Sequence, residues 1–144
     1  MEVKPIGIIH SPFKTKEEAP HQSIASNSIG RIEIFEEYEE GLEGIEGFSH
    51  IILIFRFHKS EGYSLKVKTP HDENVKGVFA TRSPRRPNQL GLSIVRLLIR
   101  EKNILFVEGI DVIDGTPLID IKPYVPSLEP KTGVKIGWLE EKIK

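Results

Sequence analysis

The stretch that decides the fold is SHIILIFRFH, residues 49–58. Its centre, residues 51–55, is apolar at every position, whereas a strand with one solvated face alternates apolar and polar side chains. A short run of this kind is typical of a central β-strand covered on both faces. We therefore expect residues 51–55 to lie in the middle of the hydrophobic core.

Further strand-like segments surround this one. Residues 29–35 alternate between isoleucine and charged side chains, which is the pattern of a half-buried strand. Residues 92–100 and 104–110 flank a three-residue polar turn and are expected to pair as an antiparallel hairpin. Other predicted strands are residues 3–9, 64–69 and 77–82.

The chain as a whole favours one all-β domain. Before the C-terminus only residues 36–47 have a helical period, and three glycines interrupt it, so short helical turns are expected there. Seven predicted strands are too many for one flat exposed sheet. With no linker or repeat in 144 residues, we expect residues 1–144 to form a single-sheet closed or partly open β-barrel.

Composition limits the possible functions. The chain has no cysteine, which excludes disulfides, thiolate nucleophiles and iron–sulfur clusters. A net charge of −1 argues against unspecific coating of nucleic acid, because that mode neutralises many phosphates. No apolar run is long enough to cross a bilayer, and the N-terminus leads into a predicted strand rather than a signal peptide. We expect a cytoplasmic protein without membrane contact.

Charge is unevenly distributed. Six glutamates fall within residues 36–46, whereas residues 82–100 contain five arginines and no acid. A locally basic face on a nearly neutral protein suits selective contact with an anion.

Residues 77–93, GVFATRSPRRPNQLGLS, contain the first candidate site. Two prolines stiffen the loop that presents Arg82, Arg85 and Arg86. Guanidinium groups bind carboxylates and phosphates at two points, so such a ligand is one interpretation. The alternative is that these arginines pair with the glutamates of residues 36–46, and residue types alone leave both open.

Residues 111–124, DVIDGTPLIDIKPY, contain the second candidate site. An aspartate–glycine turn at residues 114–117 lets Gly115 adopt a positive φ. Asp111 and Asp114 place two carboxylates at a strand end, where they can bond ribose hydroxyls or an ammonium group. The alternative is that they only cap the turn.

The histidines do not favour a metal site. His50 and His58 are expected on one face of the same strand, but eight residues separate them by about 26 Å. Residues 71–73 are interpreted as a polar turn. We predict no metal ligands.

Four longer motifs together resemble the TsaA-like, or TrmO, family. They are IGIIHSPFK at residues 6–14, GLEGIEGFSH at 41–50, GVFATRSPRRPN at 77–88 and DGTPLIDIKPY at 114–124. The resemblance spans nearly the whole chain.

The resemblance implies a β-barrel that binds S-adenosylmethionine and works as a homodimer with the cofactor close to the interface. It also implies methylation of N6 of the threonylcarbamoyl-adenosine beside the anticodon of tRNA, typically a threonine tRNA. Bacterial members carry a further C-terminal domain for tRNA, whereas this chain stops at Lys144.

The family's cofactor contacts can be placed on this sequence. The family often has Arg where this chain has His21. The implied contacts are Pro20, His21, Gln22, His58, Lys59, Arg82, Leu92, Ile110, Asp111, Asp114, Gly115 and Thr116.

Methyl transfer is an in-line displacement in which positioning supplies most of the acceleration. The acylated N6 has a delocalised lone pair, so a base that removes its proton would help, and Asp114 or Tyr124 is the candidate. Arg85 or Arg86, with Asn88, is our candidate for binding the modified base and its carboxylate. Two alternatives are a non-catalytic barrel that senses S-adenosylmethionine or a nucleotide, and a pure RNA-binding module.

Overall fold

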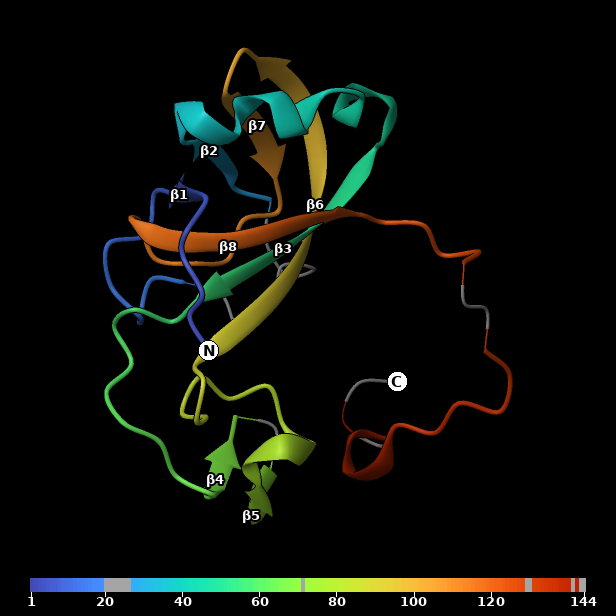
Figure 1. Ribbon diagram of the computed structural model, residues 1–144. Coiled ribbons are helices and arrows are strands. Elements are labelled where there is room, and N and C mark those ends of the chain that lie inside the picture. Colours follow the sequence, from blue (N-terminus) through green and yellow to red (C-terminus); the bar gives the residue numbers. More distant parts are fainter. Residues whose placement is uncertain (20–26, 71, 129–130, 141, 143–144) are drawn as a thin grey trace.

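A six-stranded antiparallel β-barrel forms the body of the molecule (Figure 1). The computed structural model describes residues 1–19, 27–70, 72–128, 131–140 and 142. The strands follow the order β1, β2, β7, β6, β3 and β8, and β8 pairs with β1, so the predicted all-β barrel is confirmed and is closed. These strands are β1 (Gly7–His10), β2 (Ile29–Ile34), β3 (His50–Arg56), β6 (Leu90–Glu101), β7 (Ile104–Glu108) and β8 (Thr116–Pro123).

Strand β3 lies between β6 and β8 and is paired on both edges, as expected of a central strand. Its inward side chains, Ile51, Leu53 and Phe55, are at most 2% exposed and belong to the hydrophobic core. The alternate residues Ile52 and Ile54 are only half buried. The expectation of a strand covered on both faces was therefore wrong for the outer face, because a barrel made of one sheet has a single interior.

Ile52 and Ile54 belong to an apolar patch on the outside of the barrel. Ile54 lies opposite Leu92 on β6, and Ile52 lies opposite Ile94. Leu90, Leu92 and Ile94 are 40%, 49% and 37% exposed. We call these five residues the β3–β6 patch. Contiguous exposed apolar surface of this kind is often a binding surface.

Gly91 allows two aromatic rings to lie over one end of the barrel. A Cβ at this position would sit 2.5 Å from Cε2 of Phe55 and 2.7 Å from Cζ of Phe57. The two rings meet edge to face with centroids 5.3 Å apart. The missing side chain thus lets Phe57, the first residue after β3, pack against the core.

The predicted hairpin and the predicted alternation are both confirmed. Strands β6 and β7 pair antiparallel, and Lys102 takes a φ of 56° in the turn between them. In β2, Ile32 and Ile34 are buried, whereas Arg31 is exposed.

Three expectations for the second half of the chain need correction. Residues 78–80 form a 3-10 turn, η4 (Val78–Ala80), instead of part of a strand. Strand β4 (Lys66–Thr69) pairs with β5 (Asp72–Gly77), and these two strands form a separate sheet. Asp72 and Glu73, which were expected in a polar turn, are the first residues of β5. Strand β8 was missed because its two prolines cannot donate to a ladder and so argued against a central strand.

The expected short helical turns follow β2. They are the 3-10 turns η2 (Glu36–Leu42) and η3 (Ile45–Gly47), and η2 crosses the top of the barrel in Figure 1. A last turn, η5 (Gly137–Leu139), lies near the C-terminus. Within the part of the chain that the structure describes, no helix is long and apolar enough to cross a membrane.

Strand register determines which loops share an end of the barrel. Ile9 pairs with Thr116, Phe55 with Leu118, and Arg56 with Leu90. Ile29 pairs with Glu108. The last residues of β1, β3 and β7 and the first residues of β2, β6 and β8 therefore surround one opening, which we call the site end.

Candidate functional site

Both motifs singled out in the sequence reach the site end. The aspartate–glycine turn joins β7 to β8, and the proline–arginine loop, residues 81–89, leads into β6. The backbone N–H of Phe57 donates to the carbonyl of Gln89 at 2.8 Å, which ties that loop to the end of β3. The other end of the loop follows η4 directly, and Arg82 is its second residue.

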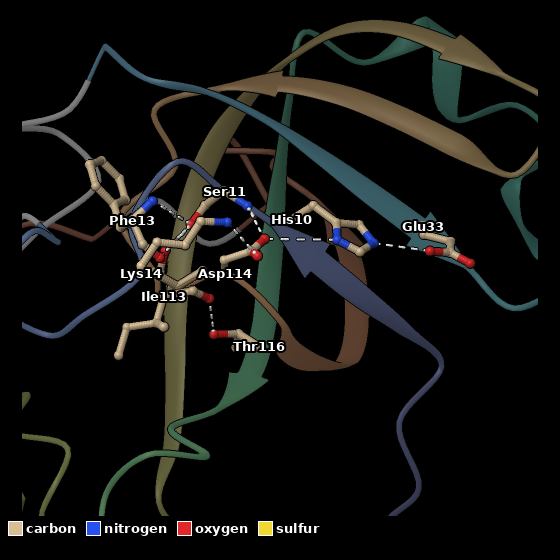
Figure 2. Close-up of polar contacts among 9 residues, drawn as sticks. His10, Ser11, Phe13, Lys14, Glu33, Ile113, Asp114 and Thr116 are labelled. Carbon is tan, nitrogen blue, oxygen red and sulfur yellow. Dashed lines mark hydrogen bonds and ion pairs between the residues drawn. The ribbon is translucent and has the colours of Figure 1, made fainter.

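The aspartate–glycine turn is fixed by a segment from the other end of the chain. Gly115 has a φ of 87°, as the turn predicted. The carboxylate of Asp114 accepts the backbone N–H of Ser11 at Oδ1 and the ammonium of Lys14 at Oδ2, both at 2.9 Å (Figure 2). The Ser11 hydroxyl donates to the carbonyl of Val112 at 2.6 Å. Asp114 thus holds the turn against the segment after β1.

The surroundings of Asp114 make it a weak base. Its hydrogen bond from Lys14 holds the pKa of this carboxyl below its ordinary value, with smaller contributions from Ser11 and His10. Figure 2 shows the His10 ring between Asp114 and Glu33, with Nε2 3.0 Å from Glu33 Oε1 and Nδ1 3.8 Å from Asp114 Oδ1. A carboxylate that is ionised and already bonded at both oxygens has little tendency to accept another proton.

Asp111 has the opposite environment. Its Oδ1 accepts the hydroxyl of Ser93 at 2.6 Å, and Ser93 is only 2% exposed inside the barrel. Burial raises the pKa of Asp111, although the Ser93 hydrogen bond acts in the other direction. Keeping a partly buried carboxylate charged beside a neutral hydroxyl costs folding free energy. A ligand that offers hydroxyl or cationic groups to this carboxylate would lower that cost.

These two carboxylates should respond to pH with opposite signs. The pKa of folded Asp111 lies above 3.8, the ordinary value. The stability of the wild type therefore falls as the pH rises from 3.8 to the pKa of the folded state. Asp111→Asn keeps an acceptor for Ser93 and removes the charge, so it should be more stable than the wild type at pH 7. That gain should disappear as the pH falls below about 4. Urea unfolding at both pH values measures it.

Asp114→Asn is the matched control. The pKa of folded Asp114 is lowered, so its contribution to stability is present above 3.8 and is lost as the pH falls through the folded value. This variant should therefore be less stable than the wild type at pH 7. Equal effects of the two substitutions at pH 7 would contradict the assigned environments.

The proline–arginine loop is braced by one of its own arginines. Nη1 of Arg86 donates to the carbonyls of Thr81 and Ser83, at 2.9 and 3.1 Å. Arg82 and Arg85 have exposed side chains, as does Asn88. Of the two candidates for binding a carboxylate, Arg85 is therefore better placed, and Arg86 has a structural role.

The glutamates of residues 36–46 lie at the opposite end of the barrel from this loop, because they follow β2 and precede β3. Arg100, at the far end of β6, is the arginine that reaches them, with Nη1 3.2 Å from Oε2 of Glu46. Pairing with these glutamates therefore does not explain Arg82, Arg85 and Arg86.

The remaining cofactor candidates divide into three groups. His58 and Lys59 form the turn after β3, where burial, Lys59 and Arg56 lower the pKa of His58 and favour its neutral form. Leu92 points outward in the β3–β6 patch, whereas Ile110 is fully buried and Thr116 bonds the carbonyl of Ile113. Pro20, His21 and Gln22 lie outside the described residues.

Tyr124 lies at the other end of the barrel from Asp114. It follows β8, and its backbone N–H donates to the carbonyl of His50 at the start of β3. The eight residues of β8 span about 26 Å, so one subunit does not bring the two candidate bases together. His58 likewise lies beyond the end of β3, not on the same strand as His50. Among the described residues, no cluster of three or more His, Asp or Glu could hold a metal ion.

The sequence alone did not predict which residues form hydrogen bonds with Asp111 and Asp114. Ser11 and Lys14 lie 103 and 100 residues from Asp114, and Ser93 lies 18 residues from Asp111. Contacts at these separations leave no local pattern. The only signal was the SPFK sequence at residues 11–14 within the first family motif.

Comparison with known proteins decides the family. Residues 8–129 match the model of the tRNA-methyltransferase O N-terminal domain. The chain belongs to this family. The resemblance inferred from the four motifs is thereby confirmed, and the TrmO domain occupies most of the chain.

Relatives of this TrmO domain carry two kinds of name. A probable S-adenosyl-L-methionine-binding protein of Pyrococcus abyssi is 52% identical over 141 residues, covering 97% of this chain and 77% of the relative. A human tRNA (adenine(37)-N6)-methyltransferase is 41% identical over 139 residues, covering 91% of this chain and 32% of the relative. The crystal structure of TrmO from Pseudomonas aeruginosa superimposes with a TM-score of 0.79 at 38% identity. The match covers 96% of this chain but only 62% of that one.

Proposed function

We propose that this TrmO domain binds S-adenosylmethionine at the site end and transfers its methyl group to N6 of threonylcarbamoyl-adenosine beside the anticodon of a tRNA, typically a threonine tRNA. The observation that carries the proposal is the arrangement of Asp111, His58 and the proline–arginine loop around one end of a barrel of this family. The names of the relatives supply the cofactor and the substrate class.

The residues at the site end match the groups that S-adenosylmethionine presents. The cofactor has ribose hydroxyls and an ammonium group, which suit the carboxylate of Asp111. Its carboxylate suits the guanidinium of Arg82. Leu92 offers an apolar surface beside the opening, and His58 is favoured in its neutral form, as an uncharged neighbour of a sulfonium cation should be.

The chain's own part in catalysis is mainly to position the reactants. When bound, the cofactor would supply an electrophilic methyl group: the N6–CH3 bond forms as the S–CH3 bond breaks, and the cofactor leaves as a neutral thioether. The proton of N6 would pass to water at the open site or to Tyr124 of a second copy. We assign Asp114 a positioning role, because its carboxylate is already used to hold the segment after β1. Tyr124 can act on this site only if a second copy of the chain brings it there.

A homodimer formed through the β3–β6 patch fits this site. Leu92 lies within the patch, so a cofactor that contacts Leu92 lies on the outer side of the barrel, next to the proposed interface. A second copy seated on the patch would cover the exposed leucines and isoleucines and close the open side of the site.

Breaking the patch should separate the two copies. We expect Ile94→Asp to give a monomer, because a charge placed among Leu92, Ile52 and Ile54 cannot be buried without a partner. Light scattering after gel filtration measures the mass. Ile29→Asp is the control, because Ile29 is 51% exposed at the start of β2, outside the patch. A monomeric wild type, or an Ile94→Asp dimer, would refute this interface.

Two assays distinguish the proposed function from its alternatives. Titration calorimetry measures binding of S-adenosylmethionine, and transfer of a labelled methyl group to tRNA bearing threonylcarbamoyl-adenosine measures catalysis. Binding without transfer would favour a sensor barrel. Salt-dependent binding of tRNA without affinity for the cofactor would favour an RNA-binding module.

A further inference from the structure

Residues 63–70 and 72–80, which include strands β4 and β5 and the turn η4, form an arm that projects from the barrel (Figure 1). Figure 1 shows both strands below the barrel, away from its sheet. A two-stranded sheet is only marginally stable by itself. The Trp138 indole donates to the carbonyl of Ala80 at 2.8 Å, and the Lys76 ammonium lies 5.6 Å from the centre of the Trp138 ring. The C-terminal segment thus supports one face of the arm.

The arm is attached directly to the candidate site. The backbone N–H of Ser64, just before β4, donates to the carbonyl of Arg85 at 3.1 Å. The Ser60 hydroxyl donates to the carbonyl of Pro84 at 3.3 Å. A molecule held on the arm would therefore lie next to the arginines of the proline–arginine loop.

Large apolar side chains on the arm face solvent. Phe79 is 74% exposed and Tyr63 is 56% exposed. Leu65 and Val75 are 59% and 51% exposed. Exposing two aromatic rings to water is unfavourable, and rings exposed in this way often bind a partner that stacks on them.

The arm and the loops beside it are basic although the whole chain is not. Residues 56–86, which include most of the proline–arginine loop, contain eight Lys and Arg and three Asp and Glu, whereas the chain has a net charge of −1. The arm itself contributes three of these lysines and two of the acids. Lys66 and Lys68 are both exposed on β4, and Lys59 is exposed at the base of the arm. A protein interface is usually depleted of lysine at its centre, whereas aromatic rings among lysines are typical of surfaces that hold single-stranded RNA.

We propose that the arm holds the RNA, with unpaired bases of the anticodon loop stacked on Phe79 and Tyr63 and with Lys66 and Lys68 against its phosphates. This inference rests on the proposed function and adds where the substrate is held. It places the modified base between the arm and the site end, within reach of Arg85.

Substitutions of Phe79 test the stacking. The probe is a synthetic RNA hairpin with a tRNA anticodon loop containing threonylcarbamoyl-adenosine, and binding is measured by fluorescence anisotropy. Phe79→Ala and Phe79→Leu should both weaken binding about 5- to 100-fold, because stacking needs a π-face. Phe79→Trp should bind like the wild type. Ile99→Ala is the control for loss of an exposed apolar side chain, because Ile99 is 53% exposed near the end of β6 that lies away from the site end.

Substitutions of the lysines test the phosphate contacts. Each of Lys66→Ala and Lys68→Ala should reduce the slope of log affinity against log salt by about 0.7, the value for one contact with a single strand. Calorimetry should show unchanged binding of S-adenosylmethionine in all arm variants, which also verifies that they fold.

The outcomes separate this inference from the proposed function. If Phe79→Leu binds RNA like the wild type, stacking is refuted. If Phe79→Ala has a lower molecular mass in solution than the wild type, the arm contacts another protein chain instead. If the wild type methylates the hairpin but no arm variant changes its affinity, only the arm assignment fails. If the wild type binds the hairpin without methylating it, and the arm variants bind it more weakly, the proposed function fails and the arm assignment stands.

Discussion

Arg82→Ala should weaken the binding of S-adenosylmethionine about 10- to 100-fold, the cost of losing hydrogen bonds between a guanidinium and a carboxylate. Arg82 is exposed in the proline–arginine loop, so its removal should leave the barrel folded. Calorimetry measures the affinity, and the thermal unfolding midpoint measures the fold.

Arg86→Ala is the matched control for the same loop. It removes the donor to the carbonyls of Thr81 and Ser83, so it should lower the unfolding midpoint. If Arg82→Ala binds the cofactor as tightly as the wild type, Arg82 has no part in the cofactor site.

Arg85→Ala should abolish the preference for modified RNA. If the Arg85 guanidinium binds the carboxylate of the threonylcarbamoyl group, affinity for a modified hairpin should fall about 10- to 100-fold, to that for the unmodified hairpin. The affinity for S-adenosylmethionine should not change. Fluorescence anisotropy with the two hairpins measures the preference.

Arg85→Lys gives an independent check of the same contact. Lysine keeps the charge but lacks the planar fork, so the preference for the modified hairpin should be reduced and not lost. A wild type that binds both hairpins equally, or an Arg85→Ala variant that keeps the preference, would show that the carboxylate is recognised elsewhere.

Much of the barrel could be predicted from local sequence patterns. The alternation in β2 and the hairpin of β6 and β7 depend on neighbouring residues, and both were confirmed. Strand β8 was missed because Pro117 and Pro123 argue against a strand when read alone. The outer face of β3 was misjudged because an apolar run does not reveal whether its second face meets the core or an exposed patch.

The candidate site was harder to predict than the fold. The sequence indicated that Asp111 and Asp114 lie at one strand end, but not that their pKa values shift in opposite directions. That difference arises because the hydrogen bond from Lys14 lowers the pKa of Asp114, whereas burial raises the pKa of Asp111. The closed barrel creates both environments by bringing distant segments together. Similarly, the sequence grouped three arginines, and only the loop geometry separates the bracing Arg86 from the exposed Arg82 and Arg85.

The most direct test of the proposed activity is the mass of the nucleosides released from tRNA after incubation with this protein and S-adenosylmethionine. We predict that threonylcarbamoyl-adenosine gains one methyl group at N6, while an otherwise identical tRNA without this modification gains none. Tight binding of the cofactor with no methylated nucleoside from the modified tRNA would contradict the account.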